Sequence, residues 1–113
     1  MGSAGYHLGE FEHMLLLCIL QLEGQAYGPA ISEELERKAS RAVSRGALYS
    51  ALGRLEEKGF LRWKLEEPGP ARGGHARRRF ELTPTGLAAL RAYRQALLRL
   101  WANVEAVIDA NSG

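Results

Sequence analysis

The residues best suited to binding chemistry lie on one short helix that the sequence predicts over residues 44–58. At about 100° per residue, one side of this helix carries Arg45, Tyr49 and Ser50, with Arg54 at its flank. Side chains of these types donate hydrogen bonds to phosphate oxygens and to base edges. The face is typical of a helix that enters a groove of DNA, and an ordinary solvated helix face is the alternative.

Two glycines, Gly46 and Gly53, lie on the same side of this helix. Each costs a helix about 0.5–1 kcal/mol relative to alanine, so helix stability is not the only requirement on this face. Close approach of another surface would explain both. The opposite side is apolar and predicts burial; it carries Leu48, Ala51, Leu52 and Leu55.

Residues that start and stop helices flank this segment. Ser44 is expected to cap its first turn, and it is also a candidate DNA contact; Gly59 is expected to end the helix in a left-handed conformation. Upstream, Pro29 opens a second amphipathic helix that runs to about Ala39. Two helices joined by about four residues predict a helix-turn-helix, in which the second helix reads DNA.

Beyond Gly59 the pattern changes from helical to strand-like. Residues 60–65 and 79–82 are strand candidates, and residues 67–75 between them are too rich in Gly and Pro to be anything but a loop. The segment therefore predicts a β-hairpin with a long basic tip beside the reading helix, as in a winged helix. Its candidate DNA-binding residues are Arg72, His75, Arg77 and Arg78.

Basic charge is concentrated in the middle of the chain. Residues 41–80 hold ten Lys or Arg and four Asp or Glu, a local charge of +6, whereas the remaining residues hold five and nine, a local charge of −4. This asymmetry favours a polyanionic partner for the middle segment, with chance clustering as the alternative.

Thr83 and Pro84 predict the start of a last helix that runs to about Ala110. Apolar residues recur along it at spacings of three and four, with a wider apolar side next to this seam. That is more apolar surface than one small domain covers, so a second copy of the chain is expected to cover it in a two-fold dimer. Folding back on its own core is the alternative. The predicted interface comprises Leu90, Tyr93, Leu97, Leu100, Trp101, Val104 and Val107.

Other features exclude several classes of protein. The longest apolar run, residues 14–20, is too short to cross a membrane and lacks the features of a signal peptide, so a cytoplasmic location is expected. Cys18, the single cysteine, lies in that run, and we expect it to be a buried core residue. The three histidines lack metal-ligand spacing, and no nucleotide loop or nucleophile motif is present. We therefore expect no metal, no cofactor and no enzymatic activity.

Several short motifs together resemble the PadR family of bacterial transcriptional regulators. They are Leu8-Gly9-Glu10-Phe11-Glu12, Tyr27-Gly28, Ser44-Arg-Gly-Ala-Leu-Tyr49, Arg54-Leu-Glu-Glu-Lys-Gly59, Gly73-Gly74 and Leu82-Thr-Pro-Thr-Gly86. The resemblance covers residues 8 to about 101, and the single helix after the wing is similar to the short branch of the family. It implies a mainly α fold with a small β-hairpin, in which residues 8–83 form a winged helix-turn-helix and residues 84–110 a dimerisation helix.

The resemblance also implies a homodimer that binds a palindromic operator in double-stranded DNA, usually as a ligand-responsive repressor. Some members of the family hold flat aromatic compounds between the terminal helices and the first helix. A small planar effector is thus a candidate partner, and the corresponding residues here are Phe11, Met14, Tyr93, Leu97 and Trp101. The competing interpretation is a winged-helix interaction module whose basic wing binds an acidic protein.

Overall fold

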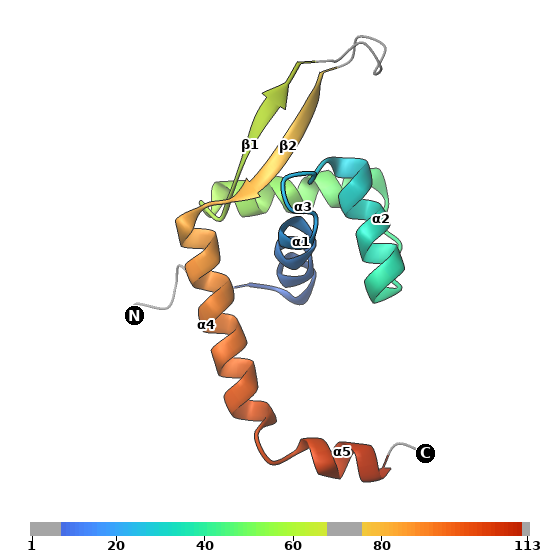
Figure 1. Ribbon diagram of the computed structural model, residues 1–113, viewed down its shortest axis with the longest axis vertical. Coiled ribbons are helices and arrows are strands. Elements are labelled where there is room, and N and C mark those ends of the chain that lie inside the picture. The colour runs from blue at the N-terminus through green and yellow to red at the C-terminus, as the bar shows by residue number, and fades with distance from the viewer. Residues whose placement is uncertain (1–7, 68–75, 112–113) are drawn as a thin grey trace.

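A computed structural model describes residues 8–67 and 76–111, over which the chain forms five helices and one two-stranded sheet (Figure 1). The elements in chain order are α1 (Glu10–Gln21), α2 (Gly28–Ala39), α3 (Arg45–Glu57), β1 (Leu61–Glu66), β2 (Arg77–Leu82), α4 (Pro84–Trp101) and α5 (Glu105–Asn111). The predicted fold class, mainly helical with a β-hairpin, is confirmed.

Helix α1 is the centre of the core. Leu15 and Leu16 are fully buried, because α2, α3, α4 and β2 all pack around this helix. Figure 1 shows α1 between α4 and α2, beneath the base of the wing. Cys18 is buried as expected, and burial raises the pKa of its thiol to about 11, so the sulfur stays protonated and unreactive at neutral pH.

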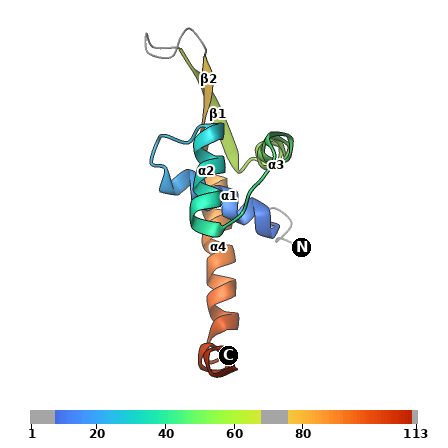
Figure 2. The same ribbon diagram turned by 90° about the vertical axis from the view of Figure 1, so that its right-hand side faces the viewer.

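Helices α2 and α3 form the predicted helix-turn-helix. Helix α2 carries Pro29 in its first turn and ends at Ser40, which has a left-handed backbone with φ of 52°. Helix α3 starts where the Ser44 hydroxyl accepts a hydrogen bond from the Ala47 amide at 3.1 Å. In Figure 2 α2 lies lengthwise while α3 is seen nearly end-on, so the pair crosses steeply.

Strands β1 and β2 form the wing, an antiparallel hairpin that projects from the helical body (Figure 1). At its base Leu61 lies opposite Leu82, and Trp63 lies opposite Phe80. The base is anchored because Leu61, Phe80 and Leu82 are buried in the core. Residues 68–75, which include the predicted DNA contacts Arg72 and His75, lie outside the described residues.

The end of α3 and the start of α4 meet in one tight corner. Gly59 has a φ of +80° and ends α3 as predicted. Thr83 caps α4 by accepting a hydrogen bond from the Gly86 amide at 3.0 Å, and its hydroxyl donates to the Gly59 carbonyl. The Thr83 amide donates to the Phe60 carbonyl at 3.0 Å. These bonds fix the direction of α4 relative to α3.

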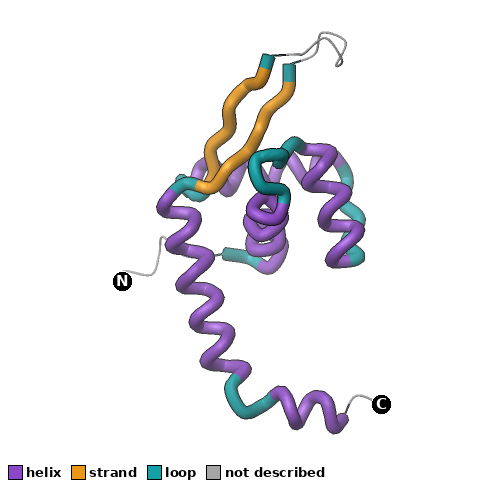
Figure 3. Tube along the Cα trace, in the orientation of Figure 1, coloured by secondary structure: helices purple, strands orange, loops and turns teal. Residues whose placement is uncertain are grey.

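The prediction of one continuous helix over residues 84–110 is wrong. Helix α4 ends at Trp101, and α5 turns away from its far end (Figure 3). The break occurs because Ala102 is extended, with ψ of 127°, and Asn103 has a φ of 69°. Asparagine adopts this left-handed conformation more readily than most residues. The seam that was expected to continue from Leu100 to Val104 is therefore interrupted.

Candidate nucleic-acid interface

Helix α3 is two-sided, as its sequence pattern predicts. Its inner residues Leu48, Ala51, Leu52 and Leu55 are buried in the core. Among its outer residues, Arg45, Ser50 and Arg54 are exposed. Because the apolar side of α3 packs on the core, its polar side is exposed to solvent.

Neither glycine of the α3 face is required by packing within the chain. A Cβ atom built on Gly46 or on Gly53 would meet no atom within 4 Å. At both positions alanine would fit and would stabilise the helix, so packing within the chain does not explain the glycines. This supports the interpretation that another molecule approaches the backbone here.

Tyr49 departs from the predicted arrangement. It was expected on the open face, but its ring is half-buried against the core, with its centroid 6.4 Å from that of Phe80. Its hydroxyl lies over Gly28 at the start of α2, where a Cβ atom would come within 2.0 Å of the Tyr49 oxygen. Gly28 is thus required for the position of this ring, and Tyr49 cannot extend freely toward a ligand.

The far end of the α3 face is tied to α1. Arg54 donates to the Ser50 hydroxyl at 3.2 Å and lies 3.7 Å from Glu12. Glu12 is buried and accepts a hydrogen bond from Lys58 at 2.7 Å. Burial alone would raise the pKa of Glu12, but the bonds from Lys58 and from the Gly9 amide hold it below its ordinary value. Arg54 and Ser50 therefore have hydrogen-bond or ion-pair partners within the chain.

A segment just before α2 is tied to β2 of the wing by an isolated bridge. The Phe80 amide donates to the Ala26 carbonyl at 2.9 Å, and Tyr27 pairs with Arg79 in an antiparallel bridge. Tyr27 is buried and reaches along the wing, where its hydroxyl donates to Glu66 at 2.7 Å. The helix-turn-helix and the wing are thus held as one unit.

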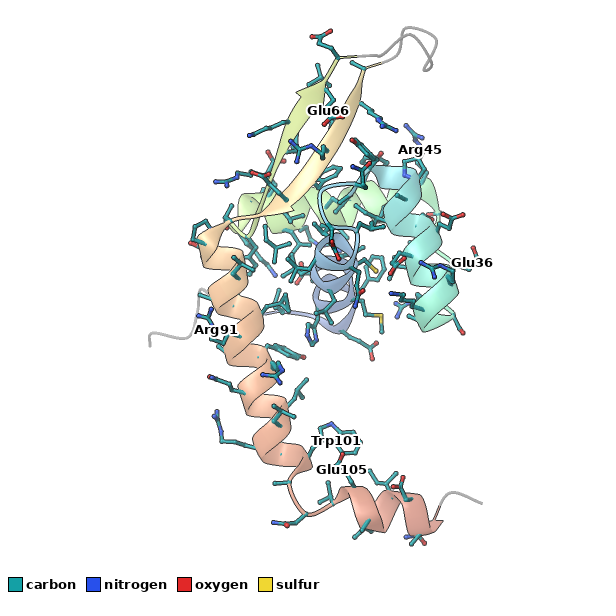
Figure 4. The ribbon with its side chains drawn as sticks, in the orientation of Figure 1. Glu36, Arg45, Glu66, Arg91, Trp101 and Glu105 are labelled. Atoms are coloured by element: carbon teal, nitrogen blue, oxygen red, sulfur yellow. The ribbon has the colours of Figure 1, made fainter. Side chains whose placement is uncertain are left out.

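A cleft of about 660 Å³ separates the start of α3 from the wing. Its walls come from the α2 start, the α3 start and both strands, and Figure 4 shows Arg45 and Glu66 at this same end of the molecule. The lining residues are Tyr27, Gly28, Pro29, Arg45, Gly46, Tyr49, Leu65, Ala76, Arg77 and Arg78. Arg45 of the predicted reading helix and the predicted wing residues Arg77 and Arg78 therefore face one cleft.

The three arginines of the cleft share an unusual environment. Each guanidinium lies over an aromatic ring: Arg45 over Tyr49 at 5.2 Å, Arg77 over Tyr27 at 3.6 Å, and Arg78 over Trp63 at 4.5 Å from the ring centroid. Within the described parts of the chain, no carboxylate lies within ion-pair distance of any of the three.

Other arginines of the helix-turn-helix and wing have carboxylate partners instead. Arg37 pairs with Glu34, Arg62 with Glu81, and Arg79 with both Glu66 and Glu81. An aromatic ring supports a guanidinium without neutralising it, and the in-plane N–H groups stay available. Arg45, Arg77 and Arg78 therefore present positive charge to the cleft that no ion pair within the described residues neutralises.

Sequence reasoning missed the residues that hold these arginines. The contacts of Tyr27, Trp63 and Glu66 with these arginines had no local signal, because they depend on how the wing packs beside the start of α2. Arg77 and Arg78 were predicted as DNA contacts and are exposed at the cleft.

The predicted dimer residues divide into two groups. Leu90 is buried in the core of its own chain, and Tyr93 is half-buried, with its ring 4.5 Å from that of His13. The first half of α4 packs on α1, so Leu90 has no surface left for a partner. Beyond it Leu97 is half-buried, and the remaining predicted residues are exposed, namely Leu100, Trp101, Val104 and Val107.

The predicted effector residues do not line either cavity described for this structure. Phe11, Met14 and Tyr93 pack against the core, whereas Trp101 is exposed at the opposite end of the molecule from the cleft (Figure 4). Within residues 8–67 and 76–111, no three His, Cys, Asp or Glu side chains are grouped to hold a metal ion. In the same residues, every helix is too short or too polar to span a bilayer.

The family model described as "Transcriptional regulator PadR-like family" matches residues 16–92, about two thirds of the chain. The chain belongs to this family. PadR-like proteins are transcriptional regulators, so the chain is a regulator and not an enzyme. The winged helix-turn-helix described above is the fold expected of a member.

Two similar proteins come from Mycobacterium tuberculosis and Streptomyces fradiae. The "Transcriptional regulator Rv3488" of Mycobacterium tuberculosis is 40% identical over 78 residues, which cover 69% of this chain and 68% of that protein. An uncharacterised 37.1 kDa protein of a Streptomyces fradiae transposon is 38% identical over 87 residues, or 77% of this chain. The match spans only 23% of the transposon protein's length.

A solved structure supports the fold. Bacillus subtilis PadR, in complex with operator DNA, superposes with a TM-score of 0.62 over 74% of this chain and 46% of that chain. The two sequences are 16% identical, so this likeness concerns the fold alone.

Proposed function

We propose that this PadR-like protein binds double-stranded DNA as a homodimer and represses transcription from a palindromic operator. The observation that carries the proposal is the cleft between α3 and the wing, in which Arg45, Arg77 and Arg78 each lie over an aromatic ring and form no ion pair with a carboxylate of the described residues. Phosphate oxygens would supply the missing counter-charge. The Bacillus subtilis PadR of similar fold is itself bound to operator DNA.

In this proposal the two basic surfaces have different tasks. Arg45 is at the start of α3 beside Gly46, where the helix can approach base edges in the major groove. Ser50 lies five residues further along the exposed side of α3 and adds a second polar contact. Arg77 and Arg78 on the wing bind flanking phosphates, which give affinity without sequence preference.

Homodimer formation rests on exposed apolar side chains at the end of the molecule opposite the cleft. Five apolar side chains of α4 and α5 are each at least 44% exposed, namely Leu98, Leu100, Trp101, Val107 and Ile108. A second copy of the chain would cover this surface and place two α3 helices on the two halves of a palindrome. The complex should then contain two chains for each operator duplex.

A pair of variants tests the DNA-binding proposal. Arg45→Ala should weaken binding to the selected operator more than binding to random duplex, by about 1–3 kcal/mol, because it removes base contacts. Arg78→Ala should weaken both by a similar factor. Fluorescence anisotropy on fragments selected from the source genome measures these affinities, and sedimentation of the complex gives the stoichiometry. Failure of the unmodified chain to bind any genomic fragment at low salt would refute the proposed function.

We also propose that a planar aromatic effector binds beside Trp101, between α4 of one chain and α1 of its partner. Trp101 is 44% exposed in the single chain, so a ligand or the partner chain can reach its ring. In a Trp63→Phe variant, Trp101 is the only tryptophan, and titration with planar phenolic or cationic compounds should quench its emission. An unchanged spectrum across a broad panel would count against this effector site.

A further inference from the structure

The strand register places Glu66 directly opposite Arg77. Opposite charges facing each other across an antiparallel pair ordinarily attract and form an ion pair. Here the Glu66 carboxylate is turned to other partners: its Oε1 accepts a hydrogen bond from the Tyr27 hydroxyl at 2.7 Å, and its Oε2 accepts one from Arg79 Nε at 2.8 Å. Both oxygens are therefore occupied by groups other than Arg77.

Arg77 is held by stacking instead. Its guanidinium carbon lies 3.6 Å from the centroid of the Tyr27 ring, and the residue is exposed in the wall of the cleft. A guanidinium stacked on a ring keeps its N–H donors pointing outward in its own plane. Arg77 thus presents charge and donors to the cleft while its cross-strand carboxylate is engaged elsewhere.

Tyr27 makes both contacts with one side chain, its ring to Arg77 and its hydroxyl to Glu66. It is only 8% exposed and is fixed at the start of α2 and by the bridge to Arg79, so it cannot move aside easily. The hydrogen bonds from Tyr27 and then from Arg79 lower the pKa of Glu66, and the charge of Arg77 has the smallest effect on it. Glu66 accordingly stays charged at neutral pH and would attract Arg77 if it were released.

We propose that Tyr27 and Glu66 are positioning residues for DNA binding: the Tyr27 hydroxyl holds the Glu66 carboxylate away from Arg77, which leaves Arg77 available to a backbone phosphate. This inference rests on the proposed DNA-binding function and deepens it. Without the hydroxyl, Glu66 turns one oxygen to its cross-strand neighbour, and the resulting ion pair competes with the phosphate.

Tyr27→Phe is the decisive variant, because it removes the hydroxyl and keeps the ring under Arg77. Binding of a random duplex should weaken roughly tenfold, and the slope of log K against log salt should fall by about one for each subunit, as one phosphate contact is lost. Adding Glu66→Gln should restore both quantities, since a neutral amide competes poorly for the guanidinium. Unchanged binding by Tyr27→Phe, or no rescue by Glu66→Gln, would overturn the proposal.

Glu81→Gln in the Tyr27→Phe background is the matched control. Glu81 is also a wing carboxylate; it pairs with Arg62 and Arg79 and does not contact Tyr27. The substitution removes the same formal charge from the same hairpin. Equal rescue by Glu81→Gln would show a general charge effect and would also overturn the proposal.

A measurement without DNA separates this inference from the proposed function. Urea midpoints of Arg77→Met, Glu66→Gln and the double variant give the coupling between the two side chains. The coupling should be small with Tyr27 present and clearly larger in the Tyr27→Phe background. Equal coupling in both backgrounds would refute the positioning role even if DNA binds. If the coupling is larger in the Tyr27→Phe background but the chain binds no DNA, Glu66 does change its partner from Tyr27 to Arg77, and the proposed function is refuted.

Discussion

Gly86→Ala is expected to lower the free energy of unfolding by about 3 kcal/mol, the upper part of the range for overpacked sites. A Cβ atom at this position would lie 2.2 Å from the carbonyl oxygen of Phe60. That oxygen cannot retreat without cost, because it accepts the hydrogen bond from the Thr83 amide. The methyl group would therefore push α4 away from the corner at the end of α3.

Urea unfolding followed by circular dichroism measures this change, and Gly53→Ala provides the control. Gly53 is helical too, but a Cβ atom there meets nothing within 4 Å, so alanine should raise the free energy of unfolding by about 0.5–1 kcal/mol. If Gly86→Ala had the same free energy of unfolding as the unmodified chain, the corner between α3 and α4 would have to yield to the added methyl group without cost.

Raising NaCl from about 50 to about 200 mM is expected to weaken DNA binding roughly 10²-fold. Arg77 and Arg78 in each of two chains neutralise about four phosphates, which gives a slope of log K against log salt of about −3.6. The aromatic neighbours matter here, because arginines already paired with glutamates would release fewer counterions. Fluorescence anisotropy with a random duplex at several salt concentrations measures the slope.

Two comparisons make the salt experiment specific. Combined alanine substitution of Arg77 and Arg78 should remove most of the slope, whereas Arg62→Ala should change it little, since Arg62 is paired with Glu81. A chain that binds as a monomer would give about half the expected slope. A flat salt dependence would contradict the phosphate-binding role of the cleft.

Local signals in the sequence were sufficient to predict most helix ends and the wing. Ser44, Gly59 and Thr83 act within a few residues of themselves, through hydrogen bonds or backbone conformation, so their roles follow from residue type and position. The apolar stripe of α3 likewise follows from the helical period. These features require no knowledge of distant contacts.

Features that depend on distant contacts were not predictable. The half-burial of Tyr49 depends on Gly28, and the positions of Arg77 and Arg78 depend on rings contributed by Tyr27 and Trp63. The end of α4 was missed for a different reason. Asn103 offered a left-handed conformation, but the apolar spacing across it was regular enough to favour a continuous helix.

The hydrogen-bonded corner between α3 and α4 has a consequence for the length of the operator. Because Thr83 at the start of α4 is hydrogen-bonded to Gly59 and Phe60 at the end of α3, the helix that would pair the two chains has a fixed direction relative to the helix that would read DNA, and the protein would set the distance between the reading helices. We infer that one extra base pair between the half-sites, which rotates one site by about a tenth of a turn, has to be absorbed by twisting the duplex.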